Sequence, residues 1–213
     1  MDSSKNYIVY GMVAITLLTM VIHDIKVDAK NDDIPIQKMP TIKVIEIKHE
    51  ESEVVQASET PTVMELPTEK EYRYIQDCPL SKEIQQGIFD ICEEYNISFE
   101  FVMSIIAQES SFRPRVIGDG GQSKGLMQIQ AKWHSEIIEE LGVTDLFDPL
   151  QNVKVGVAIL HQYFQENEEV YYVLMKYNGG ESYANKMLNA GKVSTYAIDI
   201  TERAIVYEEE NGI

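Results

Sequence analysis

Apolar residues recur at helical spacing through most of the chain after Leu80. Val102, Ile105 and Ile106 lie three and four positions apart, which places them on one face of a helix. Ser or Asp stands before several such runs, where its side chain can cap the first turn. The runs predict helices that start at about residues 81, 98, 133, 148, 170, 182 and 194. We therefore expect a compact all-α domain over residues 78–208, followed by a short tail, 209–213.

The first residues of the chain have a different pattern. Residues 7–22 contain no charged side chain and follow Lys5. An uncharged N-terminal run of this length is typical of a signal sequence or a membrane anchor. We expect residues 1–23 to form a hydrophobic helix that acts as a signal anchor, with the rest of the chain exported to face the cell wall. The alternative is a signal peptide cleaved near Ala29, which would release a secreted protein.

Residues 24–77 are rich in Glu, Lys, Thr, Pro, Val and Ser, and they lack aromatic residues before Tyr72. Such a segment buries too little apolar surface to offset the entropy lost on ordering. We expect a disordered, acidic, Pro-containing tether. Residues 41–48 alternate as a strand would, but an isolated strand has no sheet to join.

The charge of the chain excludes one class of partner. The formal net charge is -17, and the part from Cys78 onward contains 21 acidic and 10 basic residues. Nucleic-acid-binding proteins draw most of their affinity from clustered Lys and Arg. No basic run occurs along the sequence, so we expect no nucleic acid among the partners.

The cysteines and histidines do not predict a metal or cofactor site. Cys78 and Cys92 lie in an exported chain, where a disulfide is permitted. Cys92 also falls on an apolar helical stripe, where a thiol simply packs, so both readings stay open. Neither cysteine has a histidine at ligand spacing. We expect no metal and no cofactor.

Glu109 is the first candidate for chemistry. It follows Val102, Ile105 and Ile106 on the same helix face. Burial disfavours the charged form of a carboxyl and raises its pKa, which suits a general acid. The alternative is an ordinary solvated glutamate in the last turn of a helix.

A glycine-rich loop, residues 117–125, follows and leads into Leu126-Met127-Gln128-Ile129. Glycines allow the backbone to approach a ligand closely. A phosphate-binding loop is excluded because no Gly-Lys-Ser/Thr follows and no strand precedes. A calcium loop is excluded because Asp119 is the only acid in the segment.

The order of four motifs makes the sequence recognisable. Residues 107–112 (AQESSF), 125–129 (GLMQI), Asn152 with Gly156, and 177–180 (YNGG) occur in turn. Their order and spacing resemble the soluble lytic transglycosylase family, whose lysozyme-like domain cleaves bacterial peptidoglycan. The resemblance covers about residues 78–200.

The resemblance implies a role for each motif residue. Glu109 is implied to be the only catalytic carboxyl, acting as acid and then as base, which leaves 1,6-anhydro-N-acetylmuramic acid ends. Tyr177 is implied to orient that acid and Asn178 to shape its loop. For Met127 the alternative is core packing. The implied substrate-binding residues are Ser110, Gly125, Met127, Gln128, Tyr177 and Asn178.

Two positions depart from the family pattern. Lys176 stands where the family commonly has alanine, and we expect it to face solvent. The loop around Asp119 is also similar to that of goose-type lysozymes, in which an aspartate here helps to position the hydrolytic water. Those enzymes tend to have a second aspartate where this chain has Gln130. Asp119 is therefore a candidate auxiliary residue, and its alternative is a turn former.

The resemblance predicts an enzyme that cleaves the bond between N-acetylmuramic acid and N-acetylglucosamine in peptidoglycan. The alternatives are a hydrolase of the same bond and an inactive wall-binding module. Expected partners are peptidoglycan strands and the membrane, through residues 7–22. Wall turnover, phage entry, and secretion or conjugation machines that span the envelope would all use this chemistry on a tether.

Overall fold

The computed structural model describes residues 33–35 and 74–212 of the chain. The predicted membrane segment 7–22 and most of the predicted tether 24–77 lie outside these residues. Within the described part, no helix is long and apolar enough to cross a membrane.

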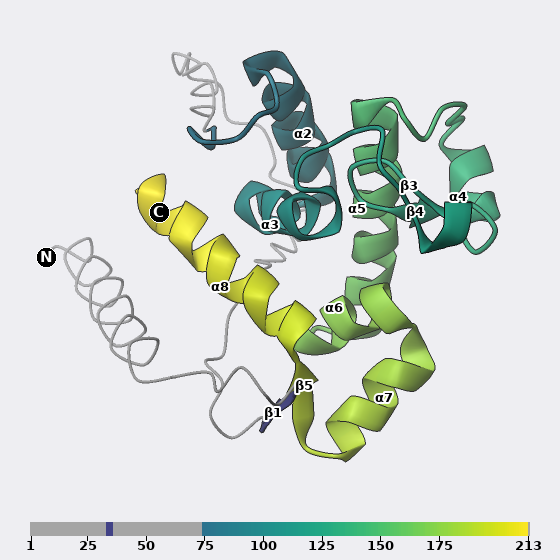
Figure 1. The fold of residues 1–213 in the computed structure, drawn as a ribbon, viewed down its shortest axis with the longest axis vertical. Coiled ribbons are helices and arrows are strands. Elements are labelled where there is room, and N and C mark those ends of the chain that lie inside the picture. The colour runs from purple at the N-terminus through teal and green to yellow at the C-terminus, as the bar shows by residue number, and fades with distance from the viewer. Residues whose placement is uncertain (1–32, 36–73, 213) are drawn as a thin grey trace, which may run out of the picture.

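The described part is mostly helical, which confirms the predicted all-α class (Figure 1). Its helices are α2 (Lys82–Tyr95), α3 (Phe99–Ser110), α4 (Ser135–Glu140), α5 (Pro149–Glu166), α6 (Val170–Gly179), α7 (Glu181–Asn189) and α8 (Thr195–Glu210).

Side-chain caps explain where four of these helices begin. The hydroxyls of Ser81, Ser98 and Ser194 accept backbone N–H groups at the starts of α2, α3 and α8. Asp148 caps α5, and Pro149 occupies its first turn, where the missing N–H costs nothing. These are the residues from which the starts were predicted.

Helix α3 forms the centre of the core. Every residue from Phe99 to Ile106 is buried. Helix α8 packs along α3, α2 packs against α5, and α6 packs against α7 (Figure 1). Helix α3 is therefore enclosed over residues 99–106, whereas residues 107–109 of its last turn are only half-buried.

Two small sheets complete the fold. Strands β2 (Ile117–Gly118), β3 (Ser123–Lys124) and β4 (Ile129–Gln130) form an antiparallel sheet, with a short 3-10 helix at Asp119–Gly121. Strand β1 (Asp33–Pro35) pairs with β5 (Lys192–Ser194). Residues 33–35 lie within the predicted tether, and β5 offers them an edge, whereas the alternating residues 41–48 lie outside the described residues.

Other details differ from the sequence-based expectations. Ile75 is buried in the core, so the folded region starts before residue 78, and α8 continues beyond residue 208. Trp133 was predicted on the apolar face of a helix, but it precedes α4 and is 68% exposed. Cys78 and Cys92 are both free thiols, and Cys92 is buried among apolar residues.

Candidate active site

Glu109 lies in the last turn of α3 and is half-buried. The fully buried residues Val102, Ile105 and Ile106 fix the helix below it. The hydroxyl of Tyr196, in the first turn of α8, donates a hydrogen bond to Glu109 Oε1 at 2.5 Å. The packing of α8 on α3 therefore supplies a donor to the carboxyl.

The surroundings of Glu109 keep it protonated to higher pH than a free glutamate. Burial raises its pKa, the hydrogen bond from Tyr196 opposes this, and the charge of Asp119 adds to the rise. Burial and the nearby Glu109 charge raise the pKa of Tyr196 well above its usual range. The phenol thus remains a donor, which can stabilise the carboxylate once Glu109 has given up its proton.

A buried amide holds the turn that faces Glu109. Asn152 of α5 is fully buried, and its Oδ1 accepts the backbone N–H of Met127 at 2.8 Å. Its Nδ2 donates to the carbonyls of Lys124 and Leu146 at 2.9 and 2.8 Å. Gly125 has φ +78°, and a side chain there would collide with the Asn152 amide. These contacts fix residues 124–127 against α5.

Further hydrogen bonds hold Met127 and Gln128, which continue this turn. Tyr177 of α6 donates its hydroxyl to the Met127 carbonyl at 2.8 Å. Gln128 has φ +50°, and its side-chain amide donates to the carbonyls of Val116 and Gly125 at 3.2 and 2.8 Å. The turn is therefore rigid where it borders the site.

Glu109 opens into a cavity of about 580 Å³ between α6 and the small sheet. Asp119 lies across it, and its Oδ2 accepts from Ser123 Oγ at 2.5 Å and from Gln130 Nε2 at 3.0 Å. The cavity is lined by Glu109, Asp119, Ser123, Gln128, Ile129, Gln130, Trp133, His134, Tyr163, Lys176, Tyr177, Asn178, Gly179 and Gly180. Polar groups dominate this lining, as a saccharide ligand requires.

Lys176 also lines the cavity, and the expectation that it faces solvent is wrong. It is 8% exposed, forms ion pairs with Glu166 and Glu181, and lies 4.4 Å from the centre of the Tyr163 ring. Burial lowers its pKa, but the hydrogen bond and charge of Glu166 outweigh this and leave the pKa raised. Through its two ion pairs, the Lys176 ammonium links the end of α6 to the end of α5 and the start of α7.

No metal site accompanies the carboxyl groups. Among residues 33–35 and 74–212, no group of three or more His, Cys, Asp or Glu side chains could hold a metal ion. Two carboxyls of the cavity lining, Glu109 and Asp119, could take part in proton transfer.

Comparison with known proteins identifies the family. Residues 87–198, about half of the chain, match the family model described as the transglycosylase SLT domain. The chain belongs to this family. The SLT match includes Glu109, the turn at residues 125–129, and Tyr196.

Known relatives of the SLT domain come from a phage and from bacteria. A transglycosylase of Enterobacteria phage PRD1 is 34% identical over 92 residues, and the invasion protein IagB of Salmonella typhimurium is 33% identical over 94 residues. These matches cover 43% and 41% of this chain but only 33% and 58% of those proteins.

A solved structure shares the fold of the SLT domain. An inactive mutant of the lytic transglycosylase Slt from Pseudomonas aeruginosa superposes with a TM-score of 0.53 at 16% identity. The match covers 62% of this chain and 25% of that chain. At this identity, the likeness shows the fold alone.

The structure divides the predicted SLT site residues into two groups. Glu109, Gln128, Tyr177, Asn178 and Asp119 line the cavity. The other three are not among the described residues that line it. These three residues are Ser110, Gly125 and Met127.

Each of those three residues has a supporting position instead. The Ser110 hydroxyl is buried and donates to the Ile106 carbonyl at 3.0 Å. Gly125 allows the close approach of Asn152, as described above. Met127 is fully buried and fills the space left by Gly156, so its core-packing alternative agrees with the structure.

The hydrogen-bond donor to Glu109 differs from the one expected. The resemblance implied that Tyr177 orients Glu109, but the Tyr177 hydroxyl donates to the Met127 carbonyl. Tyr196 donates to Glu109 and was not predicted. The cap at Ser194 places Tyr196 in the first turn of a helix, but no local pattern links it to a carboxyl 87 residues earlier.

Proposed function

We propose that this protein is a lytic transglycosylase that cleaves peptidoglycan between N-acetylmuramic acid and N-acetylglucosamine. The observation that carries the proposal is Glu109, a half-buried carboxyl of raised pKa that opens into the cavity and accepts a hydrogen bond from Tyr196. Membership of the transglycosylase SLT family supports the same chemistry.

In the proposed reaction, one carboxyl performs both proton transfers. Glu109 donates its proton to the glycosidic oxygen, and the bond between that oxygen and C1 of the muramoyl sugar breaks. The Glu109 carboxylate then accepts the proton of the C6 hydroxyl, whose oxygen bonds to C1 and forms the 1,6-anhydro ring. Tyr196 stabilises the carboxylate between the two steps. Glu109 ends protonated and ready for another cycle.

Participation of the substrate makes a second catalytic carboxyl unnecessary. Most glycosidases use two carboxyls, but the N-acetyl group of a muramoyl sugar can stabilise C1 from within the substrate. Asp119 is then free for another role. Its Oδ2 is occupied by Ser123 and Gln130, which hold the loop of residues 119–121 against the sheet.

A hydrolase is the second candidate, and the position of Asp119 is the observation that favours it. Asp119 lines the same cavity as Glu109 and contributes to its raised pKa. A carboxylate in that position could accept a proton from a water that attacks C1. The product would then have a reducing end in place of an anhydro ring.

Mass spectrometry of digested peptidoglycan tests the proposal. We expect muropeptides with anhydro ends, each one water lighter than the hydrolytic product. We also expect Asp119→Asn to keep that product with less than about tenfold loss of rate, because no proton transfer depends on Asp119. Reducing ends that disappear in Asp119→Asn would identify a hydrolase. Absence of any product would favour a wall-binding module.

Replacing Tyr196 by Phe is expected to slow the reaction at the first proton transfer, in which Glu109 becomes the carboxylate that Tyr196 stabilises. Loss of a hydrogen bond to a carboxylate, about 1.5–3 kcal/mol, corresponds to a fall of roughly ten- to a hundredfold in kcat. The same loss should raise the pKa of Glu109 further, because the bond favours the charged form. The alkaline limb of the pH–activity profile should therefore move to higher pH.

Tyr177→Phe is the matched control for this prediction. Its hydroxyl contacts the Met127 carbonyl, so its removal should leave the alkaline limb in place even if activity falls. A limb that moves in Tyr177→Phe and not in Tyr196→Phe would restore Tyr177 as the residue that orients Glu109.

We also propose that the enzyme works from the membrane, facing the cell wall. The support is the sequence alone: the uncharged residues 7–22 and the tether-like composition of residues 24–77. Such a tether would keep cleavage local, which suits wall turnover, a secretion or conjugation machine, or phage entry.

A further inference from the structure

The basic residues of the domain are unevenly distributed. Residues 74–212 contain 22 acidic and 10 basic side chains, yet the segment 113–132 has four basic residues and only one acid, Asp119. These four residues, here called the basic edge, are Arg113, Arg115, Lys124 and Lys132. They are spread over 20 positions of the sequence and therefore do not form a continuous basic segment.

The cations of the basic edge have no carboxylate partners within the described part of the chain. Lys154 and Lys176, which lie elsewhere, form ion pairs with Glu94 and Glu166. No such pair includes a residue of the basic edge. In a protein of net charge -17, leaving these four cations unpaired is unexpected.

Arg115 and Lys124 share one aromatic neighbour. Both cations lie 5.8 Å from the centre of the Phe147 ring, so each can interact with its π-system. Asp145 and Asp148 are the acids nearest to Phe147 in the sequence. Their side chains accept the backbone N–H groups of Phe147 and Gln151. Their carboxylates cap the chain and leave both cations available to a ligand.

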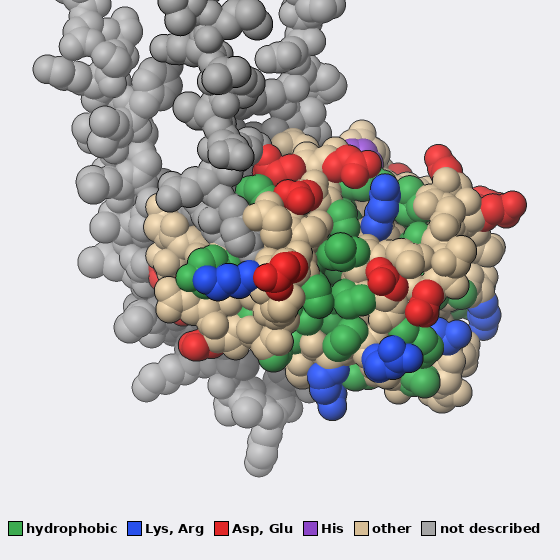
Figure 2. Space-filling view, turned by 90° about the horizontal axis from the view of Figure 1, so that it is seen from above, with side chains coloured by type: hydrophobic (Ala, Val, Ile, Leu, Met, Phe, Trp, Pro, Cys, Tyr) green, Lys and Arg blue, Asp and Glu red, His purple; other side chains and the backbone are tan. Residues whose placement is uncertain are grey.

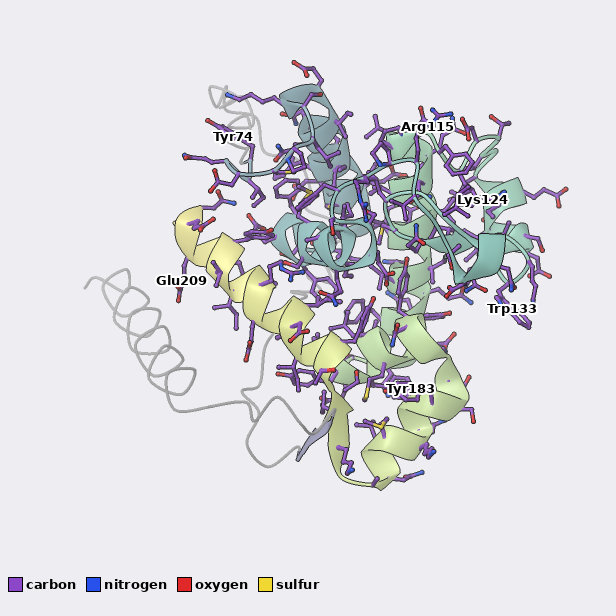
Figure 3. The ribbon with its side chains drawn as sticks, viewed as in Figure 1. Tyr74, Arg115, Lys124, Trp133, Tyr183 and Glu209 are labelled. Carbon is purple, nitrogen blue, oxygen red and sulfur yellow. The ribbon has the colours of Figure 1, made fainter. Side chains whose placement is uncertain are left out.

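The other two cations extend the basic edge in both directions. Arg113 donates Nε to the Ser110 carbonyl at 3.0 Å, and its side chain is exposed. Lys132 lies 4.3 Å from the centre of the exposed Trp133 ring, at the rim of the cavity. Arg115, Lys124 and Trp133 lie along the same side of the molecule (Figure 3). Figure 2 shows Lys and Arg side chains gathered along one edge of the face it presents.

The basic edge adjoins the cavity through strand β3 and Trp133. Ser123 lines the cavity, and Lys124 is the next residue of the same strand. Lys124 itself is not among the described residues that line the cavity. A glycan in the cavity would therefore lie beside the basic edge.

We propose that the basic edge binds the carboxylates of the peptide stems that branch from peptidoglycan. This inference rests on the proposed function. The glycan backbone itself is uncharged, so the anions that it offers lie on its stems. A stem of about four residues extends roughly 13 Å, which is enough to reach from the cavity to the adjoining basic edge. Guanidinium and ammonium groups are the usual ligands of carboxylates.

The rest of the domain carries an excess of acidic residues. Outside residues 113–132, the described domain residues 74–212 have 21 acids and six basic residues, which repel an anionic polymer. Stems can approach favourably along the basic edge. The glycan would then lie in the cavity and the stems along the basic edge.

The test compares two substrates in the full-length protein. One is soluble glycan with its stems, and the other is the same glycan after an amidase has removed them. For Arg115→Glu with Lys124→Glu, we expect kcat/KM to fall about tenfold on stem-bearing glycan, from the loss of two charge contacts near the surface. On stripped glycan the fall should be less than about twofold, since no exposed charge contact is lost there.

A matched double variant and a salt series control for indirect effects. Lys154→Glu with Lys186→Glu changes the charge equally on α5 and α7 and should leave both rates unchanged. In the wild type, raising the salt concentration toward about 1 M should weaken cleavage of stem-bearing glycan more than of stripped glycan, because screening shortens to roughly 3 Å. The salt series uses only the wild-type protein, so its result does not depend on whether a variant folds.

Equal losses on both substrates, or no loss on either, would overturn the proposal. A loss only on walls that carry phosphate polymers would replace stems by phosphates as the partner. If the wild type released no anhydro product from either glycan, the proposed function would fail. Pelleting with insoluble peptidoglycan, at low and high salt, would then test the basic edge by itself.

Discussion

Glu109→Gln should lower the rate of peptidoglycan cleavage by a factor on the order of 10³ or more. General acid–base catalysis by one side chain contributes roughly 10²–10⁴, and here one residue is proposed to act in both steps. The amide keeps the size of the carboxyl and can still accept the hydrogen bond of Tyr196. Release of soluble muropeptides from purified walls measures the effect, and full activity in the variant would refute the assignment.

The free energy of unfolding provides the control for this variant. Because burial raises the pKa of Glu109, the native state holds its proton more tightly than the unfolded chain does. That stabilisation is present at acid pH and is lost as the pH rises through the raised pKa. Glu109→Gln has no such loss, so its stability relative to the wild type should increase with pH in urea titrations. An inactive but well-folded variant therefore locates the defect in the chemistry.

Replacing Asn152 by Leu should give the largest loss of stability. Leu has a similar volume, so the change removes three hydrogen bonds without opening a large cavity. Each buried backbone group left without a partner costs about 1–3 kcal/mol, so we expect roughly 3–5 kcal/mol from a total of about 5–15 kcal/mol. The midpoint of urea unfolding, measured with its slope, checks this value.

Asn185→Leu is the matched control for the Asn152 variant. Asn185 is exposed on α7, so the same chemical change should alter the stability by less than about 0.5 kcal/mol. An equally small loss in Asn152→Leu would mean that the turn at residues 124–127 is held by other contacts.

The helices could be predicted because their signals are local. Ser98 and Asp148 cap the residues that immediately follow, and the apolar spacing of Val102, Ile105 and Ile106 fixes the buried face. Trp133 misled the prediction because its spacing from Ile137 fits a helix, whereas the chain turns before α4 and leaves the indole exposed. Periodicity cannot tell a core aromatic residue from one at the rim of a cavity.

The site could be predicted only in part, because its geometry depends on distant residues. The motif at residues 125–129 correctly marks a turn beside the cavity. It does not indicate that Met127 points into the core while Gln128, at φ +50°, faces the cavity. The strand pairing of residues 33–35 with β5 was missed for the same reason, since its partner lies far along the chain.

The contact between α8 and α3 also determines when, during synthesis, Glu109 gains its hydrogen-bond donor. Glu109 and Tyr196 are 87 residues apart in the chain. At about 5–20 residues per second, a ribosome adds Tyr196 roughly 4–17 seconds after Glu109. During that interval, the carboxyl has neither its hydrogen-bond donor nor the helix that encloses it. A nascent chain thus carries Glu109 without its hydrogen-bond donor until α8 has been made.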